Sequence, residues 1–187
     1  AFAAVDGDMS IKEGAKKYVE TAEDKKLNAE KMKDIKTFLA AEKAKTTAGK
    51  SKWVYVGIPV FRQANGYYCG PATVKEVIHY HKKKSSSQKT YAKGLGTTTA
   101  GTDMTKIAPY LRPKTQKPYA YREITTKSLW KDLCYSNMKK NKMAFIMDIK
   151  TTKKTWKYKT SGHYLPISGV NKNSLKFTKV RVSDPHR

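Results

Sequence analysis

Four residues of the sequence have the types and spacing needed for acyl transfer through a thiol: Cys69, His163, Asp184 and Gln63. A cysteine nucleophile must be ionised near neutral pH, and the partial positive charge of a helix N-terminus stabilises a thiolate. Cys69 stands directly before a predicted helix that has Pro71 in its first turn, a position that suits proline. Cys69 is therefore the candidate nucleophile.

The other three residues match the partners that such a nucleophile needs. A base must lie within hydrogen-bond reach, and an acceptor must orient the base. His163 opens an apolar strand and Asp184 ends another, so strand ends of one sheet can bring them together. Gln63 could donate its amide N–H to an oxyanion beside the backbone N–H of Cys69. Each residue alone is most often structural, so their order and setting carry the hypothesis.

The second cysteine, Cys134, has a different setting. It lies in the middle of a predicted helix among apolar neighbours. Burial there should raise the pKa of its thiol and leave it unreactive. Two cysteines are too few for a disulfide framework, and the four histidines show no ligand spacing with them, so we expect no metal site.

The N-terminal part of the chain predicts a helical hairpin. Ser10 with Glu13 fits a capping box, and we expect a short helix from there to about residue 20. Thr21 with Asp24 repeats the signal and predicts a second helix over residues 22–45. We assign residues 1–50 to an N-terminal helical extension and residues 51–187 to the main domain.

The main domain reads as helices first and strands later. The sequence predicts helices over about 70–82, 103–111 and 125–141, a basic loop over 82–89, an exposed loop or hairpin over 151–162, and strands over 53–61, 142–150, 163–171 and 176–185. This order predicts the α+β class, with an antiparallel sheet packed against a helical half.

Four segments resemble the papain-like cysteine peptidases, in particular the double-glycine (bacteriocin-leader) peptidases and their secreted relatives. These segments are QANGYYCGPATVKEVI, GTDMTKIAPYL, SGHYLPISGVN and VRVSDP, and the resemblance extends over residues 54–185. The resemblance implies a papain-like fold whose helical half carries the nucleophile. It also implies peptide-bond hydrolysis through an acyl-enzyme, without a metal or an organic cofactor.

By this resemblance each candidate residue has a role. Cys69 would be the nucleophile, His163 the general base and then acid, Asp184 the residue that orients it, and Gln63 the oxyanion donor. Two features depart from the pattern. The N-terminal extension is not part of it and could be an inhibitory prosegment, a packing extension or a spacer. Pro166 lies in the strand after His163, where it predicts an edge or a bulge.

The chain is strongly basic, with a net charge of +24 from 39 basic and 15 acidic residues. Five of the basic residues are arginines and the rest are lysines spread along the chain, a distribution that favours diffuse attraction to a polyanion over specific recognition. An anionic cell-wall polymer, membrane headgroups or an acidic substrate would fit, and so would simple solubility. Nucleic acid is an unlikely partner because no recognised binding module is present.

These observations lead to one expected function and two alternatives. We expect a secreted or surface-associated bacterial cysteine peptidase that acts as a monomer on peptides or proteins, with no transmembrane segment. The opening AFAAVDGD would fit the product of signal cleavage. The first alternative is a wall-peptide hydrolase, amidase or transpeptidase with the same triad. The second is a non-catalytic module that binds polyanions on the same scaffold.

Overall fold

The computed structural model describes residues 20–44, 52–173 and 176–186, and the predicted helix over 10–20 lies outside these ranges. The described residues form five helices and four strands. The helices are α1 (Ala22–Ala44), α2 (Cys69–Lys82), α3 (Gln88–Leu95), α4 (Met104–Thr115) and α5 (Lys127–Lys139); the strands are β1 (Lys52–Tyr55), β2 (Phe145–Thr151), β3 (Thr160–Asn173) and β4 (Lys176–Val182).

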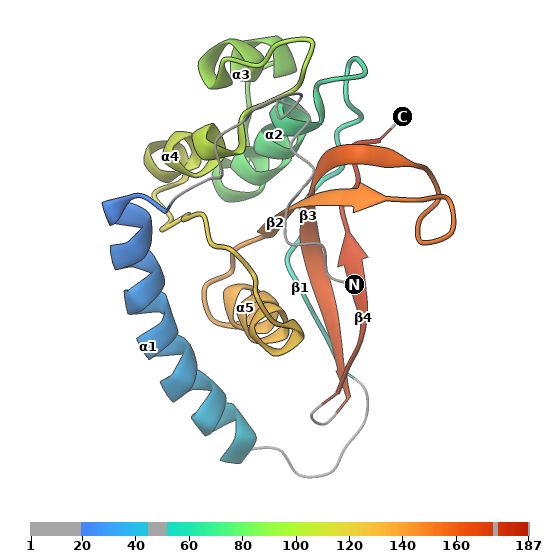
Figure 1. Ribbon diagram of the computed structural model, residues 1–187. Coiled ribbons are helices and arrows are strands. Elements are labelled where there is room, and N and C mark those ends of the chain that lie inside the picture. The colour runs from blue at the N-terminus through green and yellow to red at the C-terminus, as the bar shows by residue number, and fades with distance from the viewer. Residues whose placement is uncertain (1–19, 45–51, 174–175, 187) are drawn as a thin grey trace.

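The sheet is built around the long strand β3, which pairs antiparallel with β1, β2 and β4. Helices α2, α3 and α4 gather at one end of the molecule, and α5 lies between the sheet and α1 (Figure 1). The predicted α+β class, with helices packed against an antiparallel sheet, is therefore confirmed. The arrangement is consistent with a papain-like fold.

Helix α1 begins with the predicted capping box. The backbone N–H of Thr21 donates to the Asp24 carboxylate, and the N–H of Asp24 donates to the Thr21 hydroxyl. Asp24 is fully buried and also accepts from Arg112 at 3.2 Å and from the backbone N–H of Tyr121. Further along the helix, Ile35 is buried. Helix α1 is thus attached to α4 and to the segment that follows α4.

Helix α3 was not predicted, because the Ser- and Lys-rich sequence around it reads as a loop. Ser87 caps it by accepting from the backbone N–H of Thr90. Tyr91, Ala92 and Leu95 form its buried face, so packing rather than intrinsic propensity holds this short helix in place. Helix α4 also runs beyond its predicted end near residue 111 and continues to Thr115.

The strand interrupted by proline keeps its pairing. Pro166 lies opposite Ile146 of β2, and its carbonyl accepts from the backbone N–H of Ser183, just beyond β4. The pairing of β3 with β4 shifts register between Ile167 and Gly169, next to the proline, which fits the expected bulge. No described helix is long and apolar enough to cross a membrane.

Candidate active site

Cys69 is the first residue of α2, and its side chain is 5% exposed. The N-cap residue is Tyr68, and no side chain caps this helix end. Packing is tight beside the cysteine at Gly70, where an added Cβ would clash with the side chain of Thr102. The start of α2 is therefore pressed against the loop before α4, and any side chain at position 70 would push the two apart.

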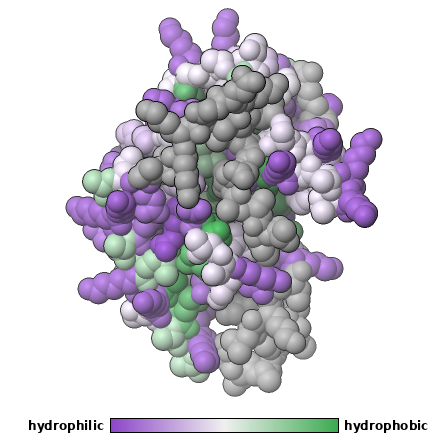
Figure 2. Space-filling view, viewed as in Figure 1, coloured by the Kyte–Doolittle hydropathy of each residue, from purple (hydrophilic) through white to green (hydrophobic). Residues whose placement is uncertain are grey.

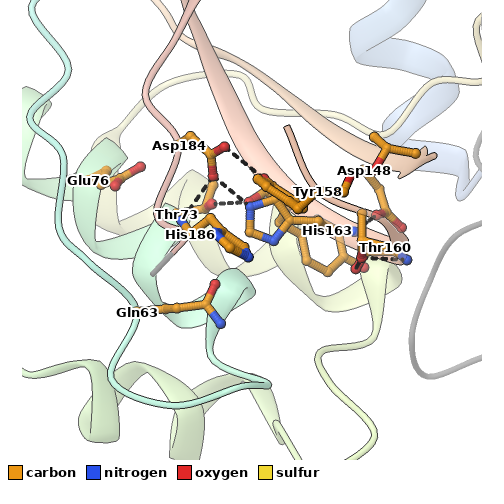
Figure 3. A network of polar contacts seen from close by, with 12 residues as sticks. Gln63, Thr73, Glu76, Asp148, Tyr158, Thr160, His163, Asp184 and His186 are labelled. Atoms are coloured by element: carbon orange, nitrogen blue, oxygen red, sulfur yellow. Dashed lines mark hydrogen bonds and ion pairs between the residues drawn. The ribbon is translucent and has the colours of Figure 1, made fainter. Parts of the chain in front are cut away.

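His163 and Asp184 are brought together by strand pairing. His163 lies on β3 opposite Ile149, and its backbone N–H donates to the carboxylate of Asp148 at 2.9 Å. Asp184 follows the end of β4, where the chain still runs beside β3. Nε2 of the His163 ring lies 2.8 Å from Oδ1 of Asp184 (Figure 3). The two residues are 21 positions apart and meet as expected from the sequence.

The charges of this pair stabilise each other. Burial lowers the pKa of His163, but hydrogen bonds to Asp184 and Cys69, together with their charges, outweigh it and raise the pKa to about 9. Burial raises the pKa of Asp184, but hydrogen bonds from His163, Tyr158 and the backbone N–H of His186 outweigh it and lower the pKa to about 2. The imidazolium and the carboxylate are therefore both charged at neutral pH.

Cys69 acts on this pair from the start of α2. A hydrogen bond to Cys69 and the charge of Cys69 are among the causes that raise the pKa of His163. The first turn of a helix beside an imidazole is where a cysteine nucleophile is expected. The structure thus joins His163 to Asp184 directly, and Cys69 influences the pKa of the histidine.

Gln63 lies on the segment that leads into α2. Its backbone N–H donates to the carbonyl of Pro185 at 2.8 Å, which ties this segment to the residue after Asp184. Its side chain is buried, and Nε2 donates to the carbonyl of Asn65 at 2.7 Å. The amide is therefore held by its own loop beside the start of α2.

Two residues that the sequence did not single out also contact Asp184. Tyr158 donates its hydroxyl to Oδ2 of Asp184 at 2.7 Å, and the backbone N–H of His186 donates to Oδ1 at 2.9 Å. The expectation that residues 151–162 form an exposed loop is wrong at Tyr158, which turns inward to the site (Figure 3). No local sequence pattern predicts the contact of Tyr158 with Asp184, because it depends on how the loop between β2 and β3 folds back.

Glu76, on the α2 helix that begins at Cys69, is another unexpected neighbour. Its side chain is fully buried; Oε1 accepts from the backbone N–H of Phe61, and Oε2 has no hydrogen-bond partner among the described residues. Burial raises the pKa of Glu76 to about 8, against the hydrogen bond from Phe61. The carboxyl is thus mostly neutral at pH 7. Its position relative to Asp184 is seen in Figure 3.

Cys134 lies in α5 and is fully buried, as expected. Burial raises the pKa of its thiol. Cys134 therefore has the buried helical setting that its sequence predicts. Within the described ranges, no group of three or more His, Cys, Asp or Glu side chains is placed to hold a metal ion.

A cysteine at a helix N-terminus, together with a histidine–aspartate pair on an antiparallel sheet, is the arrangement expected of a papain-like cysteine peptidase. Comparison with family models agrees: the model of the Peptidase_C39 like family matches residues 55–187. The chain belongs to this family, whose membership supports a cysteine peptidase. Neither the curated proteins nor the solved structures contain a match.

Proposed function

We propose that the chain is a cysteine peptidase that hydrolyses peptide bonds through an acyl-enzyme, with Cys69 as the nucleophile. The observation that carries the proposal is the 2.8 Å pair of His163 and Asp184, together with Cys69 at the start of α2 and its effect on the pKa of His163. Membership of the Peptidase_C39 like family supports the same chemistry.

In the proposed mechanism the thiolate of Cys69 attacks the carbonyl carbon of the scissile bond. The imidazolium of His163 then gives its proton to the departing amine, and the acyl group remains on sulfur. In the second half, neutral His163 takes a proton from the water that attacks the thioester, and the carboxylic acid leaves as the thiolate–imidazolium pair is restored. Asp184 stays ionised throughout and holds the ring in place.

Two donors are proposed for the developing oxyanion. One is the backbone N–H of Cys69, at an N-terminus that no side chain caps. The other is the amide of Gln63, which carries two N–H groups. The bond from its Nε2 to the carbonyl of Asn65 keeps this amide on the loop that leads into α2. The proposed chemistry uses protein groups alone and needs neither a metal nor an organic cofactor.

The net positive charge of the chain supports a proposal about where the enzyme acts. We propose that the enzyme acts as a monomer on peptides or proteins, outside or at the surface of a bacterial cell. Hydrophilic side chains project from much of the described surface on the face shown in Figure 2. Together with the net charge of +24, they would concentrate the enzyme on an anionic wall polymer.

The proposal is tested by the rate at which iodoacetamide alkylates Cys69, followed by mass spectrometry from pH 4 to 9. In the wild-type protein we expect Cys69 to react already at pH 6, because His163 keeps its proton there and stabilises the thiolate. In His163→Ala we expect the rate at pH 6 to fall at least tenfold. Cys134 is the internal control and should remain unmodified, since it is fully buried.

One outcome would overturn the proposal. If Cys69 reacts only near the unperturbed thiol pKa of about 8.5, with or without His163, the thiolate–imidazolium pair does not form. If the pair does form, screening of peptide substrates follows, and loss of hydrolysis in Cys69→Ala establishes the nucleophile.

A further inference from the structure

Tyr158 contacts the carboxylate of Asp184 on the side that His163 leaves free. Its hydroxyl donates to Oδ2 at 2.7 Å, while Nε2 of His163 lies 2.8 Å from Oδ1. Both carboxylate oxygens are therefore engaged, and each has its own donor. A carboxylate fixed at both oxygens cannot rotate about its last bond without breaking a hydrogen bond to a charged group, which is among the stronger kinds.

The Tyr158 ring also covers the pair. It meets the ring of His163 edge to face, with centroids 5.6 Å apart and an interplanar angle of 90°. On its other side it stacks on the ring of His186 at 3.7 Å and 9°. The ring of His186 also meets that of His163 edge to face, with centroids 5.9 Å apart, so two aromatic rings border His163.

The backbone around Tyr158 is held in place as well. The hydroxyl of Thr151, at the end of β2, donates to the carbonyl of Tyr158 at 2.7 Å. In the same loop, Thr152 and Thr155 are joined by hydrogen bonds that close a turn. Burial and the neighbouring carboxylate raise the pKa of Tyr158, so the phenol stays protonated and remains a donor at neutral and mildly alkaline pH.

We propose that Tyr158 is a positioning residue of the active site, acting through Asp184. Its hydroxyl holds the carboxylate in the orientation that receives Nε2 of His163, and its ring keeps the dielectric constant around this ion pair low. The inference rests on the proposed function, because it assumes that the imidazolium of His163 takes part in catalysis. It gives the loop between β2 and β3 a direct part in the acid–base chemistry.

The test compares Tyr158→Phe, which removes one oxygen atom and keeps the ring, with the wild-type protein. We expect the alkylation rate of Cys69 at pH 6 to fall about tenfold, the usual effect of losing one hydrogen bond to a charged group. The acid limb of the rate profile should move to higher pH by about one unit, because an imidazolium ring that Asp184 holds less firmly is less well placed to stabilise the thiolate of Cys69. Tyr55→Phe is the matched control: Tyr55 is 63% exposed on β1 and should leave the profile unchanged.

A second pair of variants separates positioning from a general structural role. In an Asp184→Asn background the charged acceptor is gone, so adding Tyr158→Phe should change the rate by less than twofold. An equal tenfold effect in both backgrounds would overturn the inference. So would a Tyr158→Phe profile that coincides with that of the wild type.

The titration of His163, followed by NMR of its ring nitrogens, keeps this test independent of the peptidase proposal. The wild-type pKa of about 9 should fall by at least about half a unit in Tyr158→Phe. If Cys69 proves unreactive at pH 6 while His163 still shifts in this way, the proposed function fails and the positioning by Tyr158 stands. If His163 titrates identically in both proteins, the inference about Tyr158 fails.

Discussion

At the scale of single residues, the site depends on carboxyl groups whose protonation states are set by their surroundings. Asp184 has three hydrogen-bond donors and stays ionised. Among the described residues Glu76 accepts a hydrogen bond from Phe61 alone, and burial of its side chain raises its pKa to about 8. Two acidic side chains in one region of the protein thus take opposite states at neutral pH.

The raised pKa of Glu76 predicts a pH dependence of stability. The folded state holds this proton more tightly than the unfolded chain, so the stabilisation is complete below about pH 4.5 and is lost as the pH rises through about 8. The wild-type protein should therefore lose on the order of 4 kcal/mol between these values from this group alone. In Glu76→Gln this loss should disappear, as measured by urea unfolding at pH 5 and pH 8.

Glu123→Gln, at an exposed position, is the control for this prediction and should keep the pH dependence of the wild type. If Glu76→Gln also keeps it, the buried carboxyl is ionised in both states and its assignment as a neutral group is wrong.

At the scale of elements, α1 is fastened to the main domain by a buried charge. Asp24 is fully buried, and its partner Arg112 of α4 is 14% exposed. The hydroxyl of Tyr135 in α5 donates to Glu42 near the other end of α1. These contacts support the proposal that α1 packs as part of the folded unit, although it precedes the residues that match the family.

Asp24→Asn should destabilise the protein by about 2 kcal/mol, since it removes the buried one of the two carboxylates that pair with Arg112, leaves only the exposed Glu23, and weakens the helix cap. The measurement is urea unfolding at pH 7. Asp34→Asn is the matched control on the same helix: its pair with Lys140 is 3.3 Å long but solvent-exposed. The control should cost less than about 1 kcal/mol. Equal effects of the two substitutions would contradict the anchoring role of Asp24.

At the scale of the whole molecule, the net charge of +24 should attract polyanions over distance rather than bind them at one site. Attraction between lysines and a polyanion weakens as salt screens it, whereas the reaction of Cys69 with a neutral reagent does not depend on that attraction.

We therefore expect binding to an anionic, phosphate-containing wall polymer to weaken at least tenfold between 50 and 500 mM NaCl, measured by co-sedimentation. The alkylation rate of Cys69 by iodoacetamide should change less than twofold over the same range. Binding that does not respond to salt would show that the net charge is not what attracts the polymer.

Features that depend on neighbours in the chain could be predicted from the sequence. The capping box joins Thr21 and Asp24, which are three positions apart, and the helix start at Cys69 follows from Pro71 and the apolar spacing behind it. The order of helices and strands was enough to predict the α+β class. The contact of His163 with Asp184 was also expected, because both lie at the ends of apolar strands.

The groups that surround the pair of His163 and Asp184 come from distant parts of the chain, and their positions depend on the folded structure. Tyr158 reaches Asp184 because the loop between β2 and β3 folds back over the sheet, and α3 is stable because its buried face packs in the core. The buried state of Glu76 follows from the packing of α2, and its one donor comes from Phe61, fifteen residues earlier. These features depend on solvent exclusion and long-range packing, which no local pattern of residues encodes.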